Sequence, residues 1–523
     1  MAALADSSFM AAEETEIATV GAGAAGCFFA QRLAEAGRDV VVLEAGPPWT
    51  VADLISSQIW ARRIKWGGAP TENGGSLPFG HNMNMGWGFG GAALHHYASW
   101  PRLHPSDFST RSLYGRGLDW PLTYDDLRPH YDRVQDEFGV AGNAELEQHR
   151  GPGAPYGQRQ LAAFPGGQKL AAGFDAEGLK TYPAPMAVLT EPAGDRQACI
   201  YDGWCDAGCP IGSLANPLVT SKPKAETAGA EFRSYADVRR IEADRDGRPR
   251  TLVYHDAEGR ERRLDAQTII LAGGAVHNVR LLFASQNNGE ALGNAHDLLG
   301  RYFGSHLISN VHALFEEETY PYYGLSAGTL MAQHRPDDGS GAITWGLGPA
   351  VKPNDLIGIA STRMDLFGAE LDRFMRRAAH HIALANGIVE AVTARESRVV
   401  PSGNKDAHGR DIVRIAYEAS PFTVGLWSKA NEQGTKAVRA SGAEDVWISP
   451  RPIVSHALGG TVMGEDPATS VTDAYGRLHE ASNVVVAGSG LFPSGGCVSP
   501  TFTLLALADR TAERMIAHPE EFA

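Results

Sequence analysis

The sequence predicts an α/β protein, α+β overall, with a Rossmann-like domain built from discontinuous segments and a second domain with an antiparallel sheet. Three observations predict it. An apolar strand, a glycine turn and a helix occupy residues 17–37, and a second apolar strand, DVVVLEAG, follows at 39–46. Residues 231–274 alternate short strands with Asp-Gly and Glu-Gly turns. The pattern of a buried strand returns in NVVVAGSG at 483–490.

The remaining elements follow in chain order. Residues 122–140 have helical spacing behind Thr123, a candidate N-cap. Residues 141–220 are rich in turn formers, residues 300–445 mix polar strands with helices, and TFTLLALADRTAERMIAH predicts a closing helix. We expect residues 14–125, 220–300 and 446–523 to form the first domain, 126–219 a helical and loop segment, and 301–445 the second domain.

Composition excludes several classes of protein. The chain has 523 residues and a net charge of −15, which disfavours nucleic acid and anionic membranes as partners. No apolar run approaches the ~20 residues of a membrane-spanning helix. The N-terminus, MAALADSSFMAAEETEIATV, has no basic stretch before an apolar core and no twin arginine, so no export signal is expected there. Five cysteines do not make a disulfide framework.

The glycine turn predicts a dinucleotide site. Gly21 turns the chain tightly, Gly23 lets the backbone approach a pyrophosphate, and Gly26 packs the helix on the strand. The helix begins at Ala24, so its N-terminus faces the anion. Glu44 ends the second strand and is placed to accept hydrogen bonds from ribose hydroxyls. This fingerprint alone does not distinguish NAD from FAD.

Further segments carry a family resemblance. They are GAGAAG with LEAG, GFGGAALHHYASWPRLHPSDF (88–108), HALGGTVMG (456–464) and NVVVAGSGLFPSGGCVSPTFTLLALADR (483–510). In this order they resemble the glucose–methanol–choline (GMC) oxidoreductases, from about Glu14 to the C-terminus. Residues 113–140 and the segment CIYDGWCDAGCPIG resemble the large subunit of bacterial three-subunit FAD-dependent sugar dehydrogenases, of the glucose dehydrogenase and glucoside 3-dehydrogenase type.

The resemblance implies a substrate-binding second domain and an FAD that stays bound. It implies flavin contacts from Gly90, Gly91 and Ala92, further flavin contacts from Gly488, Ser489 and Gly490, and an adenine contact near Val238. In some relatives a histidine at the position of His95 bonds covalently to the flavin, and the alternative is a noncovalent cofactor with His95 packed against it. The resemblance also implies a small subunit that carries the export signal and a cytochrome c acceptor. The expected location is therefore the periplasm, by co-export, with the cytoplasm as the alternative.

Two residues are candidates for catalysis. His456 matches the family histidine in H-x-x-G-x-T, and an imidazole with an ordinary pKa near ~6.5 can take a hydroxyl proton while the carbinol carbon gives hydride to the flavin. The second family position carries Asn or His, whereas this chain has Ser499. A hydroxyl can still donate to or accept from the substrate oxygen, but it offers less than an amide or an imidazole.

Cys199, Cys205 and Cys209 are spaced C-x5-C-x3-C. Three thiolates suit an iron–sulfur cluster of the 3Fe-4S type. The alternatives are tetrahedral zinc, which needs a fourth ligand, and inert buried cysteines.

A flavin beside a cluster predicts a dehydrogenase that passes electrons outward, and the resemblance implies that its substrate is a sugar or glycoside whose pyranose hydroxyl is oxidised to a carbonyl. Two alternatives stay open: a stand-alone sugar oxidase that uses oxygen, and a non-catalytic flavin-bearing subunit.

Overall fold

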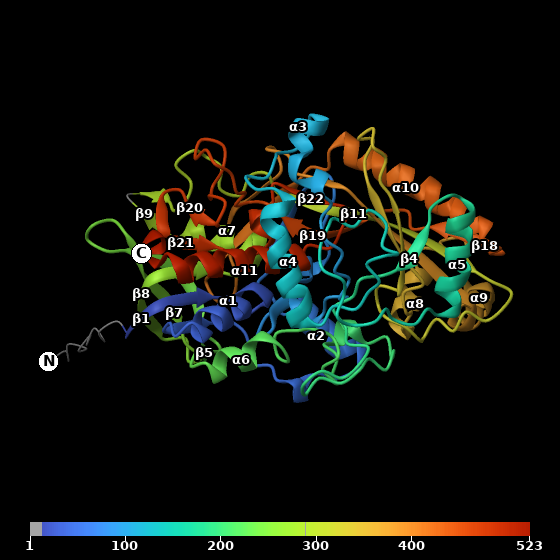
Figure 1. Cartoon of the computed structure of the whole chain (residues 1–523), viewed down its shortest axis with the longest axis horizontal. Coiled ribbons are helices and arrows are strands. Elements are labelled where there is room, and N and C mark those ends of the chain that lie inside the picture. The colour runs from blue at the N-terminus through green and yellow to red at the C-terminus, as the bar shows by residue number, and fades with distance from the viewer. Residues whose placement is uncertain (1–12, 288) are drawn as a thin grey trace.

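The computed structural model describes residues 13–287 and 289–523. Its two halves lie side by side, with β1, β8, β21 and α11 at one end and α5, α9 and α10 at the other (Figure 1). The expectation that the N-terminus lacks an export signal concerns mostly residues 1–12, which lie outside the described residues. Within the described ranges no helix is long and apolar enough to cross a lipid bilayer.

The first half is built on an eight-stranded sheet with the order β20-β21-β8-β1-β2-β5 and the hairpin β6–β7 attached to β8. Strands β21, β8, β1, β2 and β5 are parallel. The bounds are β1 Glu13–Val20, β2 Val40–Leu43, β5 Glu231–Arg233, β6 Asp237–Ala243, β7 Pro249–His255, β8 Glu261–Leu271, β20 Arg477–Leu478 and β21 Ala481–Val486. All four residues of β2 are buried, as expected for a parallel strand covered on both faces.

Helices from distant parts of the chain cover this sheet. Helix α1 (Ala24–Glu35) contacts α6 (Ser221–Thr227) and α11 (Thr501–Ala517), and α11 contacts α4 (Tyr124–Phe138). The predicted cap of α4 is confirmed, because the Thr123 hydroxyl accepts a hydrogen bond from the Asp126 amide at 3.3 Å. The last turn docks onto β8, where Thr268 donates to the carbonyl of Phe522 at 2.7 Å.

The second half contains a seven-stranded sheet with the order β18-β11-β14-β13-β12-β4, and β19 also pairs with β11. Every pairing in it is antiparallel. The bounds are β4 Thr181–Pro183, β11 Gly304–Leu314, β12 Leu330–His334, β13 Ile343–Leu347, β14 Ile382–Val389, β18 Asp445–Ile448 and β19 Ile453–Leu458. The predicted combination of a Rossmann-like domain with an antiparallel sheet is confirmed.

Two helices, α5 (Pro165–Ala176) and α10 (Pro421–Ala440), cover one face of the antiparallel sheet. Ser309 on β11 donates to the Asn431 amide oxygen on α10 at 2.6 Å, and the Trp345 ring lies 5.3 Å from Phe174 on α5. The opposite face meets the first half, because Thr344 contacts the Cys497 sulfur at 3.2 Å. The face of the sheet that does not pack on α5 and α10, termed the free face, therefore points toward the nucleotide-binding half.

The chain passes between the halves more than once. Both β4 and α5, from residues 126–219, join the antiparallel sheet or pack on it, whereas α4 from the same segment packs on α11. Strands β18 and β19 lie at the limit expected near residue 446 and pair with β11. The remaining elements are α2 Gln58–Trp66, β3 Thr71–Gly75, α3 Thr110–Tyr114, α7 Gly274–Ala284, β9 Gln286–Asn287, β10 Glu290–Ala291, α8 Pro353–Ala360, α9 Gly368–His381, β15 Ala391–Val392, β16 Arg398–Lys405, β17 Asp411–Tyr417 and β22 Ser494–Gly496.

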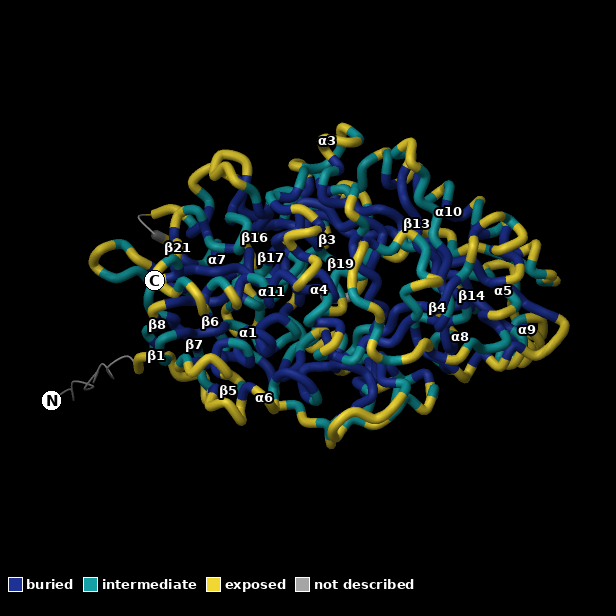
Figure 2. Tube along the Cα trace, in the orientation of Figure 1, coloured by how far each residue is buried: buried dark blue, intermediate teal, exposed yellow. Residues whose placement is uncertain are grey.

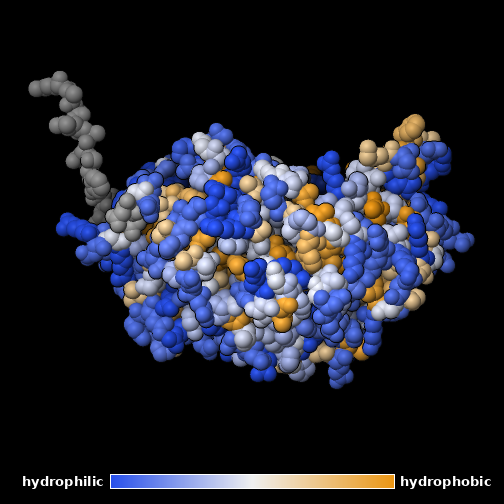
Figure 3. Space-filling model, turned by 90° about the horizontal axis from the view of Figure 1, so that it is seen from above, coloured by the Kyte–Doolittle hydropathy of each residue, from blue (hydrophilic) through white to orange (hydrophobic). Residues whose placement is uncertain are grey.

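Buried residues run through both halves and across the contact between them (Figure 2). A single apolar cluster extends from β1 and α1 to Trp345 and Val438 of the second half. The face shown in Figure 3 is mostly hydrophilic, with smaller apolar patches between the polar side chains. The continuous core fixes the free face of the antiparallel sheet against the nucleotide-binding turns.

Candidate active site

The first glycine turn has the geometry of a dinucleotide cradle. Gly21 has φ +102°, and a Cβ there would lie 2.8 Å from the Ala272 carbonyl oxygen. A Cβ on Gly26 would lie 1.9 Å from the Gly21 oxygen, so the start of α1 packs directly on the turn. A Cβ on Gly23 would meet no atom within 4 Å. The turn is thus closed at Gly21 and Gly26 and open at Gly23, the position predicted to face the pyrophosphate.

Glu44 joins three loops around this turn. One carboxylate oxygen accepts from the Ala22 amide at 2.8 Å, and the other accepts from the amides of Gly46 at 2.8 Å and Gly88 at 3.0 Å. The side chain is buried, with 7% of its surface exposed. A carboxylate offers about four acceptor sites, so one site is left for a ribose hydroxyl. The ribose contact stays a prediction, while the bracing of the loops is a role that the sequence did not indicate.

The second predicted flavin turn lies directly on the first. The Gly90 amide donates to the Ala22 carbonyl at 2.8 Å, and a Cβ on Gly91 would lie 3.0 Å from the Gly23 Cα. Ala92 is exposed, as a residue facing an open cofactor site would be. The Nε2 atom of His95 is buried and has no hydrogen-bond partner among the described residues. Burial lowers the pKa of His95 to about 3, so the ring is neutral.

The third predicted turn meets the segment that carries His456. Ser489 donates to the Ala457 carbonyl at 2.7 Å, and the Gly459 amide donates to the Ser489 carbonyl at 3.0 Å. Gly488 has φ +100° and open space where a Cβ would lie, whereas a Cβ on Gly490 would lie 2.7 Å from the Thr461 hydroxyl. The turn is therefore anchored on one side and open on the other.

These turns fit FAD. The turns are open at Gly23 and Gly488, where an added Cβ would meet no atom within 4 Å. The buried Nε2 of His95 has no hydrogen-bond partner among the described residues, and a bound cofactor could supply one. Val238 lies in β6, buried and paired with Tyr254, and its adenine contact stays a prediction. FAD, when bound, supplies a two-electron acceptor for hydride.

His456 stands in β19 with a strained backbone, at φ +66°. Its Nδ1 lies 3.1 Å from Nδ1 of His306 on β11, and Nε2 of His306 lies 3.1 Å from the Gly496 carbonyl oxygen. Burial and the neighbouring His306 lower the pKa of His456 to about 3. Ser499 follows Gly496 by three residues and is half-buried. His306 therefore links β19, which carries one predicted catalytic residue, to β22, which precedes the other.

Polar side chains line the free face of the antiparallel sheet. Residues that oppose each other across strands share a face, and the register places Gln333 opposite Thr344, Tyr182 opposite Met331 and Asn386 opposite Gly346. The face is the one on which Thr344 contacts Cys497. The Tyr182 hydroxyl and the amide oxygens of Gln333 and Asn386 are buried and have no hydrogen-bond partner among the described residues. This face therefore presents oxygen atoms that lack partners.

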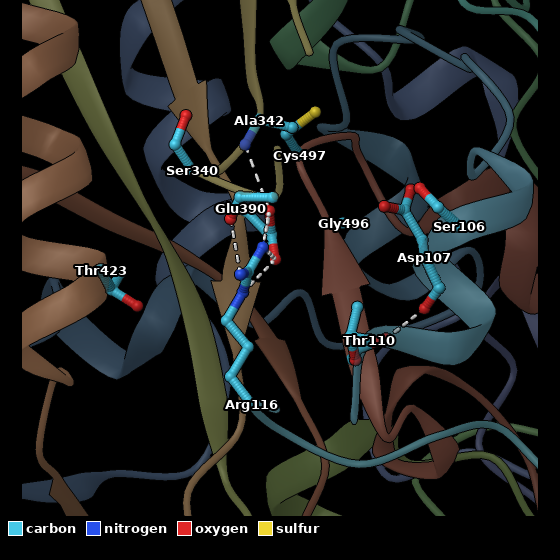
Figure 4. A network of polar contacts seen from close by, with 12 residues as sticks. Ser106, Asp107, Thr110, Arg116, Ser340, Ala342, Glu390, Thr423, Gly496 and Cys497 are labelled. Carbon is cyan, nitrogen blue, oxygen red and sulfur yellow. Dashed lines mark hydrogen bonds and ion pairs between the residues drawn. The ribbon is translucent and has the colours of Figure 1, made fainter. Parts of the chain in front are cut away.

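Buried ion pairs brace the segment between Gly496 and Ser499. Arg335 pairs with both oxygens of Asp107, at 2.8 and 3.1 Å, and donates to the Cys497 sulfur at 3.5 Å. Near it, Arg116 pairs with Glu390, which also accepts from the Ala342 amide at 3.1 Å (Figure 4). Burial raises the pKa of Glu390, although Arg116 opposes this.

The three predicted cluster ligands lie in one loop, in which Cys205 is buried and Cys199 and Cys209 are half-buried. Burial, together with a smaller effect of the neighbouring thiols, raises the pKa of Cys199 to about 11 and that of Cys205 to about 12. The Tyr201 amide donates to the Cys199 sulfur at 3.3 Å, and the Leu214 amide donates to the Cys209 sulfur at 3.4 Å. The thiols are thus close enough to interact, and backbone donors point at two of them, as suits thiolates of a cluster.

A single metal ion fits this loop less well. Zinc at about 2.3 Å from each sulfur needs sulfurs within about 4.6 Å of one another. Across residues 13–287 and 289–523 no three His, Cys, Asp or Glu side chains are grouped so as to hold one ion. The iron–sulfur cluster, the zinc site and the inert thiols therefore all stay predictions for these three cysteines.

Helix α2 connects the thiol loop to the flavin turn. It contacts both the short helix at Cys205–Ala207 and the one at Gly91–Leu94. Trp60 donates to the Ala207 carbonyl at 3.2 Å, and Lys65 pairs with Asp206 at 2.7 Å. The predicted cluster ligands and the predicted flavin contacts are therefore separated by one helix.

The structure brings together the three glycine turns and His456, with Ser499 nearby and the thiol loop one helix away. Sequence reasoning missed His306 and the partnerless oxygens of Tyr182, Gln333 and Asn386. No local motif marks these residues. Only the strand pairing places them on one face.

Comparisons with known proteins agree with this arrangement. Residues 363–508 match the family model described as GMC oxidoreductase, and residues 19–48 match a NAD(P)-binding Rossmann-like domain. The fructose dehydrogenase large subunit of Gluconobacter japonicus is 26% identical over 96% of this chain and 97% of its own length. The 6'''-hydroxyparomomycin C oxidase of Streptomyces lividus is 27% identical over 96% of this chain and 91% of its own. The crystal structure of pyridoxine 4-oxidase from Mesorbium loti has a TM-score of 0.67 at 20% identity, over 96% of this chain and 99% of that one.

The fold and the site define a flavin-dependent oxidoreductase. The chain carries a match to the GMC oxidoreductase model over residues 363–508 and is similar over most of its length to dehydrogenases and oxidases, which makes it an FAD-dependent oxidoreductase that acts on CH–OH groups of its donors.

Proposed function

We propose that this chain is the catalytic subunit of an FAD-dependent sugar or glycoside dehydrogenase, which oxidises a pyranose hydroxyl to a carbonyl. The observation that carries the substrate class is the free sheet face with its oxygens of Tyr182, Gln333 and Asn386. A buried polar atom without a partner costs about 1–3 kcal/mol. A sugar ring brings several hydroxyl donors and can satisfy all three, whereas a simple alcohol brings one.

The chain's own part in the chemistry is proton transfer and positioning. His456, with its pKa held low by burial, is an uncharged base that takes the proton of the reacting hydroxyl. Ser499 contributes a hydroxyl that can donate to the same oxygen. The glycine turns at Gly21–Gly26, Gly90–Ala92 and Gly488–Gly490 hold the FAD. Val238, Glu44 and His95 are assigned to its adenine, its ribose and its flavin end.

The route for electrons leads through the thiol loop. Cys199, Cys205 and Cys209 are proposed to hold a 3Fe-4S cluster, which supplies one-electron transfer to an external acceptor such as a cytochrome c. The support is that the three thiols share one loop, that amides are directed at two of them, and that the loop contacts α2. The alternative is an oxidase that passes electrons to oxygen, and the resemblance to 6'''-hydroxyparomomycin C oxidase supports it.

A small subunit that bears the export signal is proposed as a partner, with periplasmic location by co-export. Its support is the likeness to a protein named as a large subunit. Co-expression with and without such a subunit, followed by cell fractionation, tests this proposal, since a chain that stays in the cytoplasm in both cases contradicts it.

The substrate proposal is tested by anaerobic mixing of the purified enzyme with a panel of sugars, glycosides and simple alcohols. We expect sugars or glycosides to bleach the oxidised flavin band and simple alcohols to leave it. In His456→Ala the FAD should remain while bleaching is lost. In Gln333→Leu the sugar should bind more weakly. Bleaching by simple alcohols alone, or rapid bleaching in His456→Ala, would contradict the assignment.

The electron route is tested with Cys205→Ser. Iron and acid-labile sulfide should be lost, sugar-driven bleaching should persist, and reduction of a cytochrome should fail. Cys27→Ser is the matched control, because Cys27 is a buried thiol on α1 outside the loop, and its iron content should equal that of the wild type. Hydrogen peroxide produced under air at the rate of sugar oxidation, in wild type and Cys205→Ser alike, would establish the oxidase instead.

A further inference from the structure

Two histidines from strands 150 residues apart form a chain of hydrogen bonds at the active site. Nδ1 of His456 lies 3.1 Å from Nδ1 of His306, and the two rings meet edge to face, with centroids 5.1 Å apart at 83°. His306 has no exposed surface. Its other nitrogen, Nε2, lies 3.1 Å from the Gly496 carbonyl oxygen. The contacts therefore run from the His456 ring through the His306 ring to the Gly496 carbonyl.

The contacts determine where the protons lie. A carbonyl oxygen only accepts, so Nε2 of His306 carries the hydrogen that it donates to Gly496. A neutral imidazole has one N–H, and burial keeps His306 neutral by lowering its pKa to about 4. Nδ1 of His306 is therefore an acceptor, and Nδ1 of His456 must donate to it. The lone pair of His456 is then on Nε2.

We propose that His306 is a positioning residue that holds His456 in the tautomer whose Nε2 accepts the substrate proton. Without this contact the His456 ring could carry its hydrogen on Nε2, and that nitrogen could then not act as a base. The proposal rests on the proposed function for the identity of the base, but the tautomer itself is a property of the enzyme without substrate.

The surrounding backbone supports a role in orientation. His456 has φ +66°, a conformation in which few residues with a Cβ are found. Its neighbours are tied on both sides, since Ser305 donates to the Ser455 carbonyl at 2.6 Å and Ser489 donates to the Ala457 carbonyl at 2.7 Å. The register of β11 against β19 shifts between Gly304 and His306. These ties fix the strand, and the contact with His306 fixes the ring.

Two variants separate positioning from packing. His306→Leu fills the volume but neither accepts nor donates, whereas His306→Gln has an amide oxygen that can accept from His456 and an N–H that can reach Gly496. His312→Leu is the matched control, because His312 is a second buried histidine on β11, 3% exposed, and its Nε2 lies 3.0 Å from the hydroxyl of Ser449, the residue after β18.

The first measurement is the ¹⁵N spectrum of the holoenzyme with ring-labelled histidine and no substrate. The signals of His456 are identified by their loss in His456→Ala. We expect the unprotonated nitrogen of His456 to be Nε2 in wild type, His312→Leu and His306→Gln, and a mixture of both tautomers in His306→Leu. An unprotonated Nδ1 in the wild type, or an unchanged pattern in His306→Leu, overturns the proposal.

The second measurement is flavin bleaching by a sugar under anaerobic conditions. Hydrogen-bond partners that orient metal-bound histidines contribute about 10–100-fold to activity, and by analogy His306→Leu should lower the limiting rate constant by a similar factor while the sugar dissociation constant changes little. His306→Gln should recover most of the rate. Equal loss in both variants would mean packing alone and would overturn the proposal. If no sugar bleaches the wild type, the proposed function fails, and the ¹⁵N spectrum still decides the tautomer.

Discussion

The ion pair of Asp107 with Arg335 is predicted to be a main support of the catalytic segment. Only 2% of the Asp107 side chain and 10% of the Arg335 side chain are exposed. The pair is bidentate, and Arg335 also reaches the Cys497 sulfur, two residues before Ser499. Asp107→Asn keeps the size of the side chain and its acceptor for the His104 amide but removes the charge. The variant leaves the Arg335 cation buried without its counter-ion.

The expected loss follows from this burial. Removing one partner of a buried ion pair lowers the free energy of unfolding by about 3–5 kcal/mol. Unfolding a chain of this length has an entropy of about 1.1 kcal/mol per kelvin. The midpoint of thermal unfolding should therefore fall by about 3–5 °C. Replacing both partners, by Asp107→Asn together with Arg335→Met, should restore part of the loss, because no buried charge is then left unpaired.

Differential scanning calorimetry of the holoenzyme measures this effect. The control is Asp372→Asn, the same substitution in an exposed pair, where Asp372 is 3.0 Å from Arg376 and the side chains are 59% and 78% exposed. Its midpoint should change by less than about 1 °C. An Asp107→Asn midpoint that matches the Asp372→Asn midpoint would show that solvent reaches Arg335 and would refute the argument from burial.

Three further predictions concern protonation and packing. Because burial lowers the pKa of His456 to about 3, the base stays neutral as the pH falls. The rate constant of flavin bleaching by substrate should therefore not change between about pH 8 and pH 5. A fall in this rate constant centred near pH 6.5 would contradict the prediction. Gly26→Ala places a Cβ 1.9 Å from the Gly21 oxygen and should purify without FAD, whereas Gly157→Ala, with open space at its Cβ, should keep it. Burial lowers the pKa of His312 to about 4, so below the unfolded value near ~6.5 the unfolded state binds more protons and stability falls. The free energy of unfolding, measured with urea, should fall between pH 7 and pH 5 by about 2 kcal/mol less in His312→Gln than in wild type.

The sequence was sufficient for features whose causes are local. The strand, turn and helix at the start of the chain follow from glycine spacing and apolar runs, and the structure has β1 ending at Val20 and α1 beginning at Ala24. The cap at Thr123 is likewise encoded in its own segment. These elements depend on residues within a few positions of one another, which is the range that pattern reasoning covers.

The free face of the antiparallel sheet and the histidine pair lay beyond that range. Tyr182, Gln333 and Asn386 belong to three strands separated along the chain by long loops and helices, and only the register of β4, β12, β13 and β14 puts them on one face. The ribose contact of Glu44 was predicted from its position at the end of a strand, but its bracing of the loops was not. Its hydrogen bond with the Gly88 amide depends on where the long excursion after β2 returns, which no local pattern specifies.

The thiol loop shows how the two halves depend on each other. Asp206, next to Cys205, pairs with Lys65 on α2 at 2.7 Å and with Lys352 of the second half at 3.2 Å. Burial opposes ionisation of Asp206, yet the two lysines keep its pKa below the ordinary value, so the carboxylate stays ionised in this buried position. The loop that carries the three cysteines is thus held between the halves.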